Sequence, residues 1–288
     1  MQAIVLGLIG GSIYALIAAG ITLVYKASRV LNFAQAEVGT LSLYATWWVT
    51  VKHHQPWIVG ALASIGVAVA IGLLFERVII RPMLSASRVT VAVATIGLFS
   101  LMVAIELALF AGTIYILPPP IAHGGVKIAG VFVSSSQWLA LGVVAVVAVG
   151  LALFLRFTDF GLAVQASADD PVAAQLMGTP RGRISAFTWG MSGALSAVAV
   201  LLIEPTVGVL APGAFAGLFI GGLTAALVGG LTSLPGAFVG GLLVGIAEAE
   251  VKAHITINAI PSFQTTAMLV IVLAVLLLRP QGLLGRRA

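Results

Sequence analysis

The chain has no cysteine and very few charged residues. The absence of cysteine excludes disulfide bonds, thiolate catalysis and cysteine-ligated metal centres. Only 8% of the 288 residues are charged and 60% are hydrophobic, whereas soluble globular domains have roughly 25% and 45–50%. Such a chain cannot cover itself with polar surface. The composition therefore predicts hydrophobic side chains that face lipid as well as protein.

Motifs for nucleotide, hydrolase and metal chemistry are also missing. The sequence contains no GxxxxGK[ST] loop and no Gly-x-Ser-x-Gly nucleophile. The four histidines lie in predicted outer loops, without the spacing of metal ligands: His53, His54, His123 and His254. We therefore expect no metal, no cofactor and no enzymatic activity in this chain, and any ATP would be bound by a partner.

The positive charge of the chain does not indicate nucleic-acid binding. The formal net charge is +5 and the pI is near 10.0, but the sequence has no basic stripe interleaved with aromatic residues. The first apolar run continues to about Val24 without a basic segment before it. It is too long for the core of a signal peptide, so we expect no cleavable signal.

Long apolar segments predict an all-α, polytopic transmembrane helix bundle. We expect one transmembrane domain over residues 1–288 with about eight or nine membrane segments, some short or broken by glycine. The segments are approximately 3–25, 35–51, 57–75, 89–111, 137–155, 184–203, 213–229, 236–250 and 264–278. If the seventh and eighth form a re-entrant pair, the number of spans falls to seven.

Basic residues lie in alternate loops, after the first, third, fifth and last segments. Retention of positive charge inside the cell predicts that these loops are cytoplasmic, with the N-terminus outside and the C-terminus inside. The residues concerned are Lys26, Arg29, Arg77, Arg81, Arg88, Arg156, Arg181, Arg183, Arg279, Arg286 and Arg287.

Glycine is abundant in the membrane segments, and several glycines recur at four-residue spacing. These are Gly217, Gly221, Gly222, Gly236, Gly240, Gly241 and Gly245. Small residues at this spacing favour close helix packing in lipid. Alternatively, the Gly/Pro interruption exposes backbone groups to a solute pathway.

A polar cluster, Asn32, Gln35 and Glu37, enters the second segment. One interpretation is a helix cap at Asn32, with Gln35 three residues on and an exposed carboxylate at Glu37. The other is a contribution to a substrate path or gate, because polar groups at membrane depth are costly. A helix start that points into a pore is compatible with both.

Two further groups of charged residues can be explained by a position at the membrane interface. Glu106 lies in the fourth segment about one turn from its outer end, where it could contact a solute or extend to the interface. Glu76, Arg77 and Arg81 form a predicted interfacial anchor, in which Arg77 and Arg81 share a helix face.

The cytoplasmic loop 156–183 is the most informative connection. Asp170-Pro171 predicts a helix start and Gly178 a stop, giving a short helix over 171–177. Val172, Ala173 and Leu176 would then form a small apolar ridge suited to docking in a groove of another protein. A plain surface loop is the alternative.

The sequence strongly resembles the permeases of branched-chain amino acid ABC importers, the LIV type, over nearly its whole length. The resemblance is carried by Gly11-x-x-Tyr14-Ala15-Leu16, Asn32-Phe33-Ala34-x-x-Glu37, Ala166-x-Ala168-Asp169-Asp170, Gly229-Gly230-Leu231-x-Ser233-x-Pro235-Gly236 and Arg279-Pro280-Gln281-Gly282-Leu283. The family usually reads Asn-Phe-Ala-His-Gly-Glu, whereas this chain has Gln35-Ala36 in place of His-Gly. That departure puts leucine-type substrates in doubt without disturbing the architecture.

The resemblance implies a pore formed in the bacterial inner membrane with a second homologous permease. It also implies two cytoplasmic ABC ATPase subunits, an extracytoplasmic solute-binding protein, and a coupling helix within 169–181. The expected coupling residues are Asp169, Asp170, Ala173, Leu176, Gly178 and Arg181. The expected substrate path comprises Tyr14, Asn32, Gln35, Glu37, Thr95 and Glu106.

Two other functions remain to be distinguished from an ATP-driven importer. An ion-gradient-driven carrier or channel usually has acidic or basic groups in mid-membrane, and the deep segments here have few. A non-transporting scaffold would leave the Asn32–Glu37 cluster without a transport role.

Overall fold

A computed structural model describes residues 2–83, 85–110, 113–128, 130–254, 270 and 282–284. The helices are α1 Gln2–Ser28, α2 Gln35–Trp47, α3 Trp57–Phe75, α4 Arg88–Phe110, α5 Ser135–Phe157, α6 Asp159–Asp169, α7 Pro171–Leu176, α8 Arg181–Val207, α9 Ala216–Gly229 and α10 Leu234–His254. The predicted all-α membrane bundle is confirmed. Apart from residue 270, the ninth predicted segment, 264–278, lies outside the described residues.

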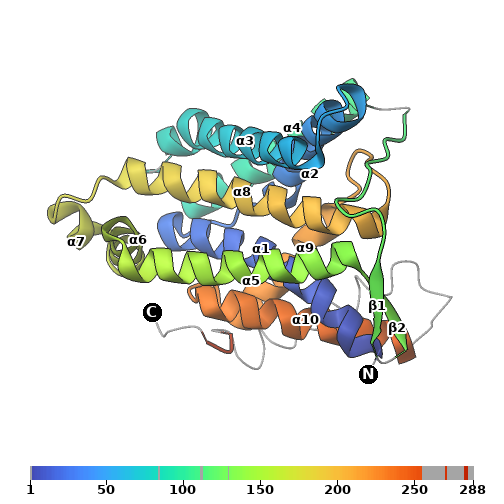
Figure 1. Ribbon diagram of the computed structural model, residues 1–288. Helices are drawn as coiled ribbons and strands as arrows, with labels where there is room; N and C mark the ends of the chain where they lie inside the picture. The colour runs from blue at the N-terminus through green and yellow to red at the C-terminus, as the bar shows by residue number, and fades with distance from the viewer. Residues whose placement is uncertain are drawn as a thin grey trace.

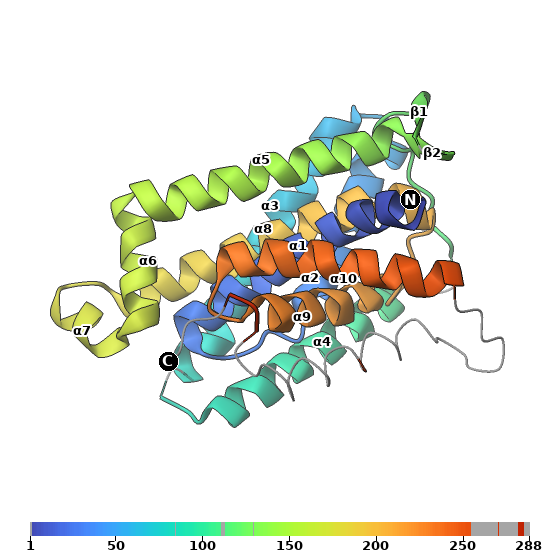
Figure 2. The same cartoon turned by 90° about the horizontal axis from the view of Figure 1, so that it is seen from below.

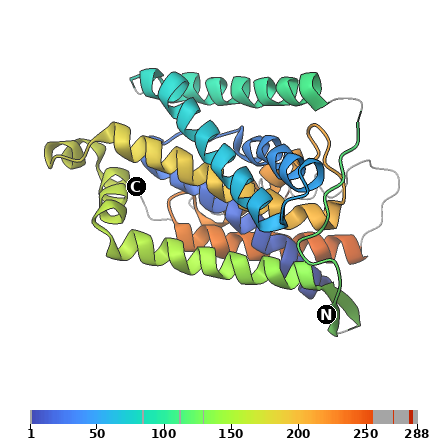
Figure 3. The same ribbon diagram turned by 45° about the horizontal axis from the view of Figure 1, so that its top comes forward.

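Helices α1 and α8 form the centre of the bundle, and α4 and α5 lie on opposite sides of it (Figures 1, 2 and 3). In α1 and α8, 67% of the most apolar window is buried, whereas in α4 and α5 only 22% is buried. The side chains of the peripheral helices are therefore left to face lipid or a partner.

Six helices of the described chain are long and apolar enough to cross a membrane: α1, Trp57–Met83, α4, α5, α8 and α10. Helix α9 has only 14 residues, which is about 21 Å at 1.5 Å per residue. Helix α10 has 21 residues, enough to span the hydrocarbon core. By length, α10 can therefore cross the hydrocarbon core, whereas α9 is shorter than that core.

Helices α1 and α10 cross at glycines. A methyl group added at Gly11 would lie 2.6 Å from the Gly241 carbonyl oxygen, and one added at Gly7 would lie 2.6 Å from the Ile246 Cα. The two backbones therefore touch without side chains between them, which is the packing that lipid requires. The packing interpretation of Gly241 and Gly245 is confirmed.

Four local structures were not predicted. Helix α3 continues through a π-helix, η2 Glu76–Ile80, and a 3-10 turn, η3 Arg81–Met83, while a second π-helix, η1 Trp48–Lys52, ends α2. Strands β1 Gly125–Ile128 and β2 Val131–Ser134 form an antiparallel hairpin in the loop 112–136. Hydropathy did not indicate α6, which begins where the Thr158 hydroxyl accepts the Gly161 N–H at 2.9 Å.

Candidate functional site

The connection between α1 and α2 lies inside the bundle and is held by Thr95. The Thr95 hydroxyl donates to the Leu31 carbonyl at 3.1 Å and accepts the Phe33 N–H at 3.4 Å. Thr95 lies seven residues after Arg88, the first residue of α4, which corresponds to about 10 Å along the helix. Helix α2 therefore begins about two turns along α4, with its first N–H groups inside the protein.

Asn32 supports the start of α2, although it is not the N-cap. The N-cap residue is Ala34, so that assignment was wrong by two residues. The Asn32 Oδ1 accepts the Ala34 N–H at 3.1 Å, and its Nδ2 donates to the Gln35 Oε1 at 3.1 Å. The predicted local pairing of Asn32 with Gln35 is therefore present, but the two side chains bond to each other and not as a capping box.

Gln35 joins α2 to α8. Its Nε2 donates to the Ser192 carbonyl at 2.8 Å, and its Oε1 accepts the Ser192 hydroxyl. The Ser196 hydroxyl bonds to the Gln35 carbonyl and accepts the Gly39 N–H. Sequence reasoning missed the two serines. The spacing of Ser185, Thr188, Ser192 and Ser196 along one face of α8 could have indicated them.

Glu37 and Glu106 meet beneath the loop that precedes α9. Both side chains are fully buried, and the two carboxyl groups interact. The Glu106 Oε2 accepts the Gly213 N–H at 3.2 Å. The interpretation with an exposed Glu37 carboxylate and the interfacial alternative for Glu106 are both wrong, because both side chains are buried in the protein.

The pair leaves polar atoms without hydrogen bonds. The oxygens of Glu37 and the Tyr44 hydroxyl are buried, and within the described residues they have no hydrogen-bond partner. Tyr44 interacts electrostatically with both carboxyl groups and stacks on Phe110, with ring centroids 3.8 Å apart. Buried polar groups with few partners are costly, which makes the cluster a candidate site.

We name Asn32, Gln35, Glu37, Thr95, Glu106, Ser192 and Ser196 the polar seam. The seam contains five of the six residues expected in the substrate path. The sixth, Tyr14, bonds to a different helix. Its hydroxyl donates to the Glu248 Oε2 of α10 at 2.7 Å, and its ring packs against Gly221 of α9.

The predicted short helix forms α7, which projects from one end of the bundle (Figure 1). The Asp170 Oδ1 accepts the Ala173 N–H at 3.0 Å, as expected at a helix start. Gly178 has φ +88°, which suits a helix stop. Leu176 and Met177 are 83% and 87% exposed. The side chain of Val172 lies outside the described residues, whereas Ala173 is exposed.

The remaining coupling residues flank α7. Asp169 ends α6 and is exposed, and Arg181 begins α8. The six residues therefore occupy one continuous segment, 169–181, at the projecting end, and we call it the coupling segment.

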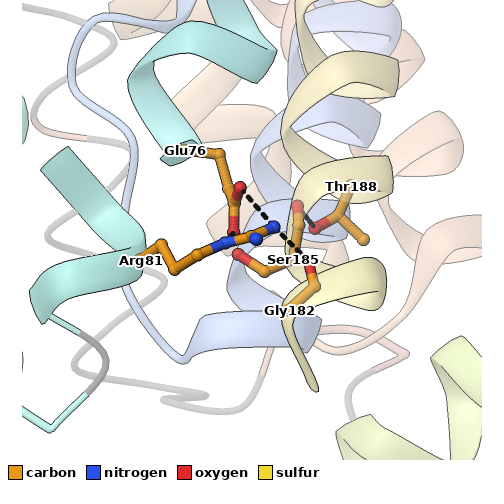
Figure 4. Close-up of polar contacts among 5 residues, drawn as sticks. All are labelled: Glu76, Arg81, Gly182, Ser185 and Thr188. Atoms are coloured by element: carbon orange, nitrogen blue, oxygen red, sulfur yellow. Dashed lines mark hydrogen bonds and ion pairs between the residues drawn. The ribbon is translucent and has the colours of Figure 1, made fainter. Parts of the chain in front are cut away.

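Arg81 pairs with Glu76 at the end of the α3 continuation and also bonds to the start of α8 (Figure 4). The Arg81 guanidinium donates to Glu76 at 3.2 and 3.0 Å and to the Gly182 carbonyl at 3.0 Å. An α-helix would not pair residues five apart, but the π-helix at 76–80 brings them together. Glu76 is buried, and Arg81 connects it to the Gly182 carbonyl, beside the coupling segment. We call Glu76, Arg81 and Gly182 the clasp; it stands where the sequence predicted an interfacial anchor.

Replacing Arg81 with glutamine is expected to lower stability by about 1.5–3 kcal/mol, because it removes charged hydrogen bonds from the buried Glu76 carboxylate. Thermal denaturation of the purified chain in detergent measures the loss. Arg77→Gln removes the same charge from an exposed neighbour and should leave the melting temperature unchanged. An equal shift in both variants would contradict the clasp.

Comparison with known proteins identifies relatives along nearly the whole chain. The family model described as "Branched-chain amino acid transport system / permease component" matches residues 3–278. The high-affinity branched-chain amino acid transport system permease protein BraD of Pseudomonas aeruginosa is 35% identical over 298 residues, covering 99% of this chain and 96% of BraD. The LivH permease protein of Escherichia coli is 30% identical over 291 residues, covering 96% and 92%.

A solved structure shares the fold. A chain of PsaBC from Streptococcus pneumoniae, determined in complex with Fab, has a TM-score of 0.51 and covers 98% of this chain and 93% of its own length. Its sequence identity is 12%, so the likeness concerns the arrangement of helices alone.

Proposed function

The chain belongs to the family of permease components of branched-chain amino acid transport systems, and we propose that it is the translocation subunit of an ATP-driven importer in the inner membrane. The observation that carries this proposal is a family match over residues 3–278 in a charge-poor helix bundle from which the short helix α7 projects. Because the sequence lacks a nucleotide-binding loop, we propose that this chain is not itself an enzyme.

The energy would come from partner proteins. We propose a second, homologous permease that completes the path, two ATPase subunits that bind and hydrolyse ATP, and an extracytoplasmic protein that delivers the solute. The exposed Leu176 of α7 is suited to an apolar groove on an ATPase subunit. Movement of α7 would reach the seam through α8, which begins five residues after α7 ends and carries Ser192 and Ser196.

The polar seam would line or gate the solute path. In this proposal Gln35 exchanges its bonds to Ser192 and Ser196 when the helices rearrange, and the Glu37–Glu106 pair opens beneath Gly213. Such exchange lets one set of polar groups serve two conformations, each favoured by a different ligand. Tyr14 would act at the α9 and α10 side of the same path.

The solute is proposed to be a small polar molecule such as an amino acid, an amide or an organic acid. The names of BraD and LivH make branched-chain amino acids the first candidates. Gln35-Ala36 lies at the centre of the seam, where the family usually has His-Gly. A different hydrogen-bonding side chain at this point favours testing amides and organic acids beside leucine.

Reconstitution in proteoliposomes tests the importer against an ion-gradient-driven carrier. Uptake of a radiolabelled leucine, amide or organic acid is expected only with the partner permease, both ATPases, the binding protein and ATP present. Liposomes with this chain alone and an imposed proton or sodium gradient provide the matched control. Accumulation by the chain alone would contradict the proposed function and support the carrier.

A further inference from the structure

A large pocket opens at the end of the bundle where α6 lies, and none of the polar-seam residues lines it. Its volume is about 1070 Å³, and α1, α5, α6 and the start of α10 contribute to its walls. Small-molecule sites typically measure roughly 300–1,000 Å³. The pocket can therefore hold a ligand at least as large as a typical small molecule.

Positive charge gathers at the mouth of the pocket. Among the described lining residues, Lys26, Arg29 and Arg156 are basic and only Asp169 is acidic. Lys26 lies in the last turn of α1, and Arg156 lies in the last turn of α5. Arg29 is fixed in place, because its guanidinium donates to the Ala168 carbonyl at 2.7 Å. This mouth is complementary to an anionic group at the membrane surface.

The inner wall of the pocket is apolar and continues toward the bilayer centre. On α5 the wall runs from Arg156 through Ala152 to Ala148 and Val149, a distance of about 12 Å along a helix axis. Phe238 of α10 lies on the wall formed by the start of that helix. A small anion would need only the charged mouth, whereas an acyl chain would also use this apolar wall.

The pocket is accessible from the lipid side. Val149 is 59% exposed, and Ala152 and Arg156 are also exposed. These three residues share one face of α5 by their spacing of three and four. Figure 2 shows α5 at the edge of the bundle, with α6 turning beneath its end.

We propose that this pocket binds an anionic phospholipid of the cytoplasmic leaflet. The phosphate contacts Arg156, Lys26 and Arg29, and the acyl chains lie against α5 and α10. The proposal goes beyond solute transport and assigns a lipid partner to the junction of α5 with the coupling segment. Basic side chains at the cytoplasmic surface attract anionic lipid, each contributing about fivefold to binding.

Native mass spectrometry of the full-length chain in detergent, titrated with short-chain phosphatidylglycerol or phosphatidylcholine, tests the proposal. Phosphatidylglycerol should bind more tightly than phosphatidylcholine. Arg156→Gln should raise the Kd for phosphatidylglycerol about fivefold and leave that for phosphatidylcholine unchanged. Arg156→Lys, which keeps the charge, should retain most of the preference and shows that the site has not collapsed.

Two controls can overturn the proposal. Arg88→Gln removes an exposed cation from the start of α4, at the same membrane surface but outside the pocket lining; an equal loss of lipid preference there would mean that surface charge alone attracts the lipid. Inorganic phosphate and glycerol phosphate should not compete, because they lack acyl chains. Displacement by either would identify a site for a free anion and would overturn the lipid assignment.

Discussion

Replacing Leu176 with aspartate is expected to abolish ATP-driven uptake, with a loss of at least tenfold, while the chain still inserts in the membrane. Leu176 is 83% exposed on a six-residue helix that projects beyond the bundle. Its removal costs the isolated chain little, but a carboxylate forced into an apolar groove is costly by several kcal/mol. Uptake and solute-stimulated ATP hydrolysis in proteoliposomes measure the loss.

Ala173→Arg tests the same contact from the preceding turn of α7. Ala173 is exposed, so the larger side chain is tolerated in the chain alone and obstructs only a docked partner. Ser85→Asp introduces the same charge as Leu176→Asp on an exposed turn between α3 and α4, and it should transport normally. Normal uptake in both α7 variants would refute α7 as the coupling helix.

The sequence was sufficient to predict the elements that hydropathy controls. A helix that crosses lipid needs an uninterrupted apolar run, so α1, α4, α5, α8 and α10 were located to within a few residues of their ends. The short helix α7 was also predicted, because Asp170, Pro171 and Gly178 act locally through capping and backbone conformation.

Features that depend on distant contacts could not be predicted in this way. The π-helix at 76–80 changes which side chains are neighbours, so the pairing of Glu76 with Arg81 was invisible to α-helical spacing. The positions of Glu37 and Glu106 depend on the loop at Gly213, more than a hundred residues away. Sequence indicated polar groups at depth but could not show what covers them.

The contacts among the predicted path residues divide in the same way into local and distant ones. Gln35 and Asn32 are three residues apart, so their pairing follows from local geometry. The partners of Gln35 on α8, Ser192 and Ser196, are placed by the packing of α2 on α8. Tyr14 was assigned to the path from a motif alone, and its bond to Glu248 depends on how α1 crosses α10.

The crossing of α1 and α10 leads to the second large expected effect. Gly11→Ala should destabilise the folded chain by about 2–3 kcal/mol, because the added methyl group would lie 2.6 Å from the Gly241 carbonyl and 2.9 Å from the Leu242 Cα. Backbone atoms cannot rotate away as a side chain would. The two helices must separate, and the contacts at Gly7 and Gly245 weaken with them.

Gly10→Ala is the matched control, one residue away on the same helix. No heavy atom of the described residues lies within 4 Å of a methyl group placed at Gly10. The substitution should therefore be neutral or stabilising by up to about 1 kcal/mol, because alanine favours the helix over glycine. Melting of both variants in detergent, followed by circular dichroism, gives the comparison. Both substitutions gain the same helix propensity, so the difference between their melting temperatures measures the clash with α10. Equal melting temperatures would mean that α1 and α10 are not in backbone contact.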